Sequence, residues 1–182
     1  MDADVLSSGA VTRLAPLVDA FLERRDGRAV LRRIQREDLE QLRLHRNRAE
    51  VRRYLTDDRE LTPELQEAWF LAGAHERLRI VEIRSQGGVV SVGLARLGPG
   101  AEVGCDAFEL GSGFGAVALE MACRAVVREG RPYLTTFLEN DRGVRLYDQA
   151  GFVWDTGATL RFYLRDFGDG LRPRAHGRMV LP

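Results

Sequence analysis

The chain of 182 residues contains no lysine, and all 27 of its basic residues are arginine. This absence excludes a Schiff-base lysine and the lysine of a P-loop. Acidic residues also number 27, so the formal net charge is zero. Without a basic excess, nothing in the charge favours nucleic acid or an anionic membrane as a partner.

Cysteine and long apolar runs are also scarce. Cys105 and Cys123 form no CxxC motif and lie among apolar neighbours, which favours reduced core thiols and a cytoplasmic location. Residues 1–13 lack the basic segment and apolar run of a secretory signal. The most apolar stretch, 113–127, contains an acidic and a basic residue, so we predict no membrane span.

The residues that are present fit one domain, since 45% are hydrophobic and 30% are charged. Residues 1–27 stand apart as an N-terminal helical extension, because apolar residues from Val11 to Leu22 recur at helical spacing and Asp26-Gly27 ends the run. We expect this helix to pack on the body or on a second subunit, as in a homodimer. Residues 28–182 are expected to form a single domain.

That domain is expected to be α/β with mixed layers. Strand patterns occur at 30–34, 78–84, 89–97, 102–108, 133–138, 152–155, 160–164 and 179–181, and helical patterns at 36–44, 114–128 and 141–149. Thr62-Pro63-Glu64 predicts a further helix with Thr62 as its N-cap. Glycine pairs at 87–88 and in Gly98-Pro99-Gly100 predict an antiparallel meander.

A glycine-rich turn, Gly111-Ser112-Gly113-Phe114-Gly115-Ala116, directly precedes the start of a predicted helix. Glycine lets backbone N–H groups converge on a ligand, and a helix N-terminus adds partial positive charge, so the turn suits a pyrophosphate without any lysine. A plain tight turn explains the same glycines. A dinucleotide-binding turn or an S-adenosylmethionine-dependent methyltransferase is disfavoured, because those folds need a parallel sheet and an antiparallel meander precedes this turn.

The second half of the chain carries a more specific pattern. Asn140 closes a predicted strand, and the following helix leads into Leu146-Tyr147-Asp148-Gln149-Ala150-Gly151-Phe152, an LYxxxGF motif. With the meander and the glycine turn, this pattern resembles the GCN5-related N-acetyltransferases (GNAT) over about residues 30–181. The resemblance implies a mixed central sheet of about six to seven strands flanked by about four helices, with the N-terminal helix added.

The resemblance also implies a site for acetyl-CoA as co-substrate. In that family the glycine loop holds the pyrophosphate, the Asn contacts the coenzyme and the Tyr hydroxyl protonates the leaving thiolate. Here these parts are the turn at 111–116, Asn140 and Tyr147. Leu110 stands where relatives often carry Gln or Arg, so pyrophosphate binding would depend more on backbone amides. A core tyrosine with a satisfied hydroxyl is the alternative for Tyr147.

Acetyl transfer to an amine needs a polarised carbonyl and a proton acceptor. The family's geometry implies that backbone N–H groups of Cys105 to Ala107 polarise the thioester, so Cys105 and Ala107 are expected to contact the coenzyme. Glu102 and Asp106 lie four apart on the same predicted strand and share a face. Some relatives use a carboxylate on this strand, which favours Glu102 as the base, but Asp106 lies nearer the turn. Both carboxylates also fit a solvent-facing role.

The resemblance implies direct attack by a small-molecule primary amine in a ternary complex. Arg46, Asn47 and Arg52, followed by Thr62 to Phe70, resemble the RimJ/RimL-like and nucleotide-amino-sugar branch. This resemblance implies an amino sugar or a nucleotide-linked amino sugar as acceptor, with these three residues as candidates to bind a nucleotide diphosphate. A solvated arginine-rich helix face is the alternative. A protein N-terminus as acceptor, or a non-catalytic acyl-CoA-binding protein, are the alternative functions.

Histidine offers little further guidance. His45 is a candidate for the acceptor site because it adjoins Arg46-Asn47, and His75 and His176 are interpreted as surface residues. The three show no metal-ligand spacing, so no metal site is predicted.

Overall fold

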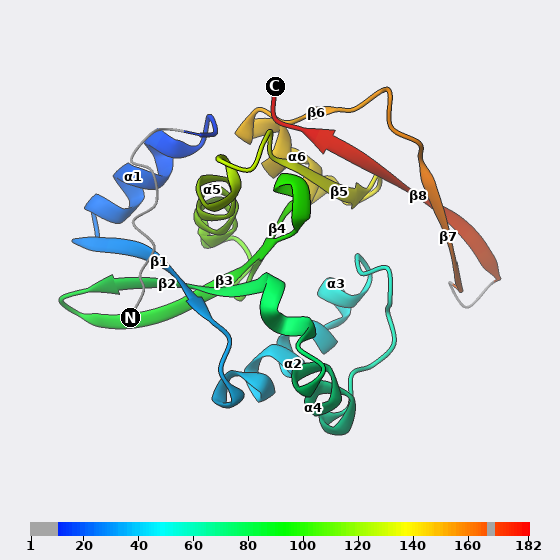
Figure 1. Ribbon diagram of the computed structural model, residues 1–182, viewed down its shortest axis with the longest axis horizontal. Coiled ribbons are helices and arrows are strands. Elements are labelled where there is room, and N and C mark those ends of the chain that lie inside the picture. The colour runs from blue at the N-terminus through cyan, green and yellow to red at the C-terminus, as the bar shows by residue number, and fades with distance from the viewer. Residues whose placement is uncertain (1–10, 167–169) are drawn as a thin grey trace.

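A computed structural model describes residues 11–166 and 170–182. Within these residues, eight strands form two four-stranded sheets, and six α-helices accompany them (Figure 1). The α/β class is as predicted, but the expectation of one sheet with six to seven strands and five helices is corrected. The expected single sheet divides into two because the two strands that would lie in its middle pair with each other at one end only.

The first sheet is the predicted antiparallel meander. Its strands are β1 (Gly27–Arg33), β2 (Leu78–Ser85), β3 (Gly88–Leu97) and β4 (Val103–Ala107), which pair in that order. A bulge in β3 falls opposite the Val81–Glu82 step of β2. Alternate residues of β2 enter two separate cores, with Val81 and Ile83 in one and Ile80 in the other. Both faces of this sheet are therefore covered.

The second sheet is built around its last strand, most of which the sequence pattern did not predict. It comprises β5 (Tyr133–Phe137), β6 (Val153–Trp154), β7 (Arg161–Asp166) and β8 (Leu171–Val180), and β8 pairs with the other three. The prediction of a final strand at 179–181 was too short, because Pro173 and Gly177 interrupt the apolar pattern. Pro173 is tolerated because β8 pairs there with β7 alone, so one strand edge needs no N–H donor.

The two sheets meet at a single parallel bridge between Glu102 and Tyr133. Beyond this bridge no ladder joins β4 to β5 in the described part of the chain. The two strands therefore separate, which leaves the edge of β4 open.

Helices cover the first sheet from opposite sides (Figure 1). Helices α1 (Ala15–Glu23) and α5 (Phe114–Val126) pack against one face. Helices α2 (Leu39–Asn47) and α4 (Pro63–Leu71) pack on the other, where Leu42 and Trp69 join Ile80. The remaining helices are α3 (Ala49–Arg52), α6 (Asp141–Ala150) and the short 3-10 turns η1 (Arg36–Asp38), η2 (Ala74–Arg77) and η3 (Pro99–Ala101). No described helix is long and apolar enough to cross a bilayer.

The described part of the N-terminal extension packs on the body. Leu14 and Val18 are 3% and 1% exposed and belong to the main core. The Thr12 hydroxyl donates to the fully buried Glu120 carboxylate at 2.6 Å, and Arg124 donates to the other oxygen at 2.7 Å. The extension is therefore fastened to α5 by apolar packing and by a buried polar network.

Candidate functional site

A cavity of about 960 Å³ opens where β4 and β5 separate. One side of it is formed by β4, the glycine turn and α6, and the other by α2, α3 and α4. Twelve of the residues predicted for the site line this cavity: Arg46, Glu102, Cys105, Asp106, Ala107, Leu110, Gly111, Gly113, Gly115, Ala116, Asn140 and Tyr147. Four others, Asn47, Arg52, Ser112 and Phe114, are not among its lining residues.

The glycine turn has the backbone that its sequence suggests. Gly111 and Gly113 have φ angles of 86° and 84°, in the left-handed region that favours glycine. Ser112 stabilises the turn from within, since its hydroxyl donates to the Glu109 carbonyl at 2.7 Å and accepts from the Phe114 amide at 3.3 Å. The N-terminus of α5 follows directly, which presents amides and partial positive charge at the cavity wall.

The open edge of β4 presents backbone donors to the cavity. The Phe108 amide donates to the Val92 carbonyl of β3 at 3.0 Å. Because successive amides of a strand point to opposite edges, those of Cys105 and Ala107 point away from β3, toward the open edge. The two amides that the sequence favoured as carbonyl donors therefore lie at the edge that faces the cavity.

Tyr147 lies in α6 beside the same strand. Its side chain is 9% exposed, and its hydroxyl lies beside the Cys105 thiol. Burial raises the pKa of Tyr147 well above its usual range, and the nearby Cys105 and Asp106 add to that shift. Burial also raises the pKa of the Cys105 thiol to about 12. At neutral pH both groups are protonated, so Tyr147 is a donor and Cys105 is a poor nucleophile.

Asn140 forms the N-cap of α6. Its side-chain oxygen accepts from the Gly143 amide at 3.2 Å, and its amide nitrogen donates to the Thr136 hydroxyl at 3.2 Å. This capping role fixes the start of the helix that carries Tyr147, one and a half to two turns further on.

The structure joins two residues that the sequence treated separately. Nε2 of His45, in the last turn of α2, lies 2.8 Å from Oδ2 of Asp106 in β4. The other predicted base, Glu102, precedes β4 and folds over the Gly98 turn, since a Cβ at Gly98 would lie 2.6 Å from its Oε2. Sequence spacing gave no sign of the His45 contact, because 61 residues separate the partners.

The residues predicted to hold a nucleotide instead hold a loop. Arg46 donates to the carbonyls of Asp57 and Arg59 at 2.8 and 2.7 Å, and Asn47 exchanges two hydrogen bonds with the backbone of Leu61. Arg52 lies 3.6 Å from Glu60. These contacts fasten α2 and α3 to residues 57–61, and of the three side chains only that of Arg46 lines the cavity.

The lining residues that were not predicted from the sequence include two arginines and a glutamine. Arg96 and Arg142 form no ion pair with any described residue and are exposed at the cavity. Gln66 in α4 is 4% exposed, and its side-chain amide bonds to no described residue. Guanidinium groups and the amides of the glycine turn suit phosphate oxygens, so the residues present fit a phosphorylated coenzyme. No described cluster of His, Cys, Asp and Glu could hold a metal ion.

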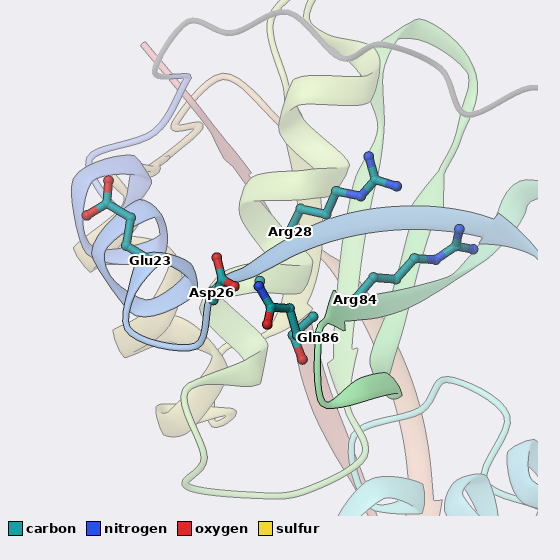
Figure 2. A pocket seen from close by; sticks show the side chains of 7 residues that line it. Glu23, Asp26, Arg28, Arg84 and Gln86 are labelled. Atoms are coloured by element: carbon teal, nitrogen blue, oxygen red, sulfur yellow. The ribbon is translucent and has the colours of Figure 1, made fainter.

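A second depression, of about 680 Å³, lies where β1 begins and β2 ends. Among its labelled side chains, Arg28 and Arg84 both extend away from Glu23 (Figure 2). They do not converge on a common point, so the cavity beside β4 is the candidate site.

No protein-family model and no curated protein sequence matches the chain. Solved structures do match its fold. Spermidine N-acetyltransferase from Vibrio cholerae, in complex with CoA and spermine, superimposes with a TM-score of 0.61 at 19% identity, over 84% of this chain and 95% of that one. The ribosomal-protein-alanine N-acetyltransferase from Brucella melitensis gives 0.58 at 16% identity, over 83% and 99%.

A third similar structure is yncA from Salmonella typhimurium with its cofactor acetyl-CoA, with a TM-score of 0.59 at 18% identity over 85% and 95% of the two chains. The antiparallel meander before the glycine turn also differs from the parallel sheet of a methyltransferase. The chain therefore has the fold of the GNAT N-acetyltransferases.

Proposed function

We propose that this protein is an acetyl-CoA-dependent N-acetyltransferase that acts on the primary amine of a small molecule. One observation carries the proposal: the glycine turn, the open edge of β4 and the Tyr147 hydroxyl all line one cavity. The similar structures with CoA or acetyl-CoA support the same coenzyme here.

Each group has a task in direct attack within a ternary complex. The coenzyme supplies the acetyl thioester. Amides of the glycine turn, with Arg142 nearby, hold phosphate oxygens, while the Cys105 and Ala107 amides stabilise negative charge on the carbonyl oxygen. The Tyr147 hydroxyl then gives a proton to the departing sulfur. Holding both substrates beside β4 supplies much of the acceleration.

The first test is calorimetric titration with acetyl-CoA, with S-adenosylmethionine in parallel. We expect micromolar binding of acetyl-CoA alone. An amine panel with detection of released thiol then identifies the acceptor, and it should include glucosamine because an amino sugar was predicted from the sequence. Failure of both coenzyme binding and thiol release would refute the proposal.

Acetylation of a protein N-terminus is the second candidate, supported by the similarity to the Brucella enzyme. Peptides with free N-termini in the same panel separate the two functions. A non-catalytic role rests only on Leu110, which is 43% exposed at the turn where a polar residue was expected. Turnover of any amine would exclude the non-catalytic role.

A further inference from the structure

The acceptor side of the cavity contains a histidine–carboxylate pair with unequal partners. His45 is 3% exposed and packs edge-on against Phe108, with ring centroids 5.1 Å apart. Asp106 is 36% exposed and lines the cavity. The histidine is therefore the buried member, and only the carboxylate is open to a ligand.

The hydrogen bonding assigns the roles within this pair. Nδ1 of His45 is buried and has no partner among the described residues. A proton on Nδ1 would leave a buried donor unsatisfied, which costs more than leaving its lone pair unused. Nε2 therefore carries the proton and donates to Oδ2 of Asp106, which leaves Oδ1 for a ligand.

The backbone at Asp106 is held closely against β3. Leu94 of β3 pairs with Asp106, and a Cβ at the neighbouring Gly93 would lie 2.2 Å from the Asp106 carbonyl oxygen. Glycine thus lets β4 approach β3 closely at this residue. Arg48 forms a second contact with this segment, because it donates a hydrogen bond to the Phe108 carbonyl at 2.9 Å.

Asp106 and Tyr147 flank the open edge of β4 from opposite faces. Side chains alternate along a strand, so Asp106 points toward α2, while Cys105 points toward Tyr147. An acetyl group held at the edge between them would meet a proton acceptor on one side and a donor on the other.

The buried and half-buried part of the wall beyond Asp106 is mainly apolar, while Glu50, Arg53 and Asp57 line the cavity from exposed positions. One buried polar group in this wall bonds to no described residue. That group is the Gln66 amide, one turn before Trp69 in α4. The apolar lining residues on this side include Leu42, Val51, Tyr54, Leu55, Trp69 and Leu94. Such a wall suits an aliphatic or aromatic body with a single hydrogen-bonding group.

We propose that these residues form the acceptor subsite: Asp106 takes a proton from the attacking amine, His45 positions Asp106, and Gln66 with the apolar wall holds an uncharged amine body. This inference rests on the proposed acetyltransferase function. In the step, the amine nitrogen forms a bond to the thioester carbon and the carbon–sulfur bond breaks. The amine proton passes to Asp106, and the sulfur leaves as the thiol with the proton of Tyr147.

The test compares variants of the full chain with tyramine, phenethylamine, hexylamine, glucosamine, spermidine and a short peptide as acceptors. We expect D106N to lower kcat by at least about 100-fold. H45F removes the donor and should lower kcat by about 10-fold or more, whereas H45Q can place an amide donor near the Nε2 position and should stay within about threefold of the wild type. Q66L should raise the acceptor KM by about 3- to 10-fold at similar kcat.

H75F is the matched control, because His75 also has a buried Nδ1 without a described partner but does not line the cavity. It should retain wild-type kcat. Acetyl-CoA affinity and the urea midpoint, measured for every variant, separate lost chemistry from lost folding. Equal losses of kcat in H45F and H45Q would show that His45 acts only through packing. That result would contradict its role in positioning Asp106.

Two further results would overturn the inference while the proposed function stands. A larger loss of kcat in E102Q than in D106N would identify Glu102 as the base. A clear preference for glucosamine or spermidine would overturn the apolar-bodied acceptor. If the wild type binds no acetyl-CoA and releases no thiol with any amine, the proposed function fails and this inference fails with it.

Discussion

At the scale of single residues, the environment of Tyr147 decides what its hydroxyl can do. It is buried beside the Cys105 thiol, and that burial favours the neutral form of both groups. A neutral tyrosine donates a proton or a hydrogen bond but does not act as a base at neutral pH. The same surroundings make Cys105 an unreactive neighbour.

Y147F should lower kcat by about 100-fold, because it removes the donor for the leaving sulfur while keeping the ring. The pKa of Tyr147 is raised above the ordinary value, so the hydroxyl is protonated at pH 7 and at pH 9. The loss should therefore be the same at both values, and acetyl-CoA affinity should change little. Steady-state kinetics with thiol detection checks this, and a loss confined to pH 9 would contradict the assigned role.

Cys105 should not become acetylated during turnover. Its pKa of about 12 leaves almost no thiolate at neutral pH. Intact-mass measurement after incubation with acetyl-CoA and no amine should show the unmodified chain. A stable acetyl adduct that disappears when amine is added would instead indicate a covalent intermediate.

At the scale of elements, the site depends on how closely β3 and β4 approach. Gly93 lies opposite Ala107, next to Asp106, and has no room for a side chain. Gly87, in the hairpin between β2 and β3, has only a side-chain atom at 3.6 Å from the position of a Cβ. Substitutions at the two glycines can therefore be compared. A loss at Gly93 alone would reflect a requirement of the site, whereas a loss at both would reflect a general sensitivity of the hairpin to a side chain.

G93A should destabilise the protein by about 1–3 kcal/mol and lower kcat, because the strands must move apart at the carboxylate. Urea unfolding and kinetics measure the two effects. G87A is the control and should change stability by no more than about 0.5 kcal/mol. Similar results for both variants would show that close approach at Gly93 is not needed.

At the scale of the whole molecule, the N-terminal extension is part of the fold. Phe21 of α1 packs edge-on against Phe114, with ring centroids 6.0 Å apart, at the end of the glycine turn. Thr12 reaches the buried carboxylate of Glu120 in α5. The extension thus supports the helix whose N-terminus forms one wall of the cavity.

T12V should lower the free energy of unfolding by about 1–3 kcal/mol, since it removes a donor from a buried carboxylate without changing side-chain size. Urea denaturation checks the value, with T56V at an exposed position as the control. A value within about 0.5 kcal/mol of the wild type would mean that this network contributes little.

Local pattern in the sequence determined the meander, the start of α4 at Thr62 and the helices on either side of β5. These features depend on alternation, glycine turns and capping, which act between residues close in the chain. The glycine turn was found in the same way, whereas Tyr147 was found through the LYxxxGF motif of the family resemblance. A final strand was predicted only at 179–181, because the pairing of β8 with three partners is not local.

The sequence by itself thus determined the element types, the resemblance to GNAT enzymes and twelve of the residues that line the cavity. Only the tertiary structure joined His45 to Asp106, turned Glu102 over the Gly98 turn and engaged Arg46 and Asn47 with the 57–61 loop. It also left the Gln66 amide without a described partner in an apolar wall. The physical reason is that side-chain partners are chosen by packing across elements, and packing brings together residues whose distance in sequence carries no signal.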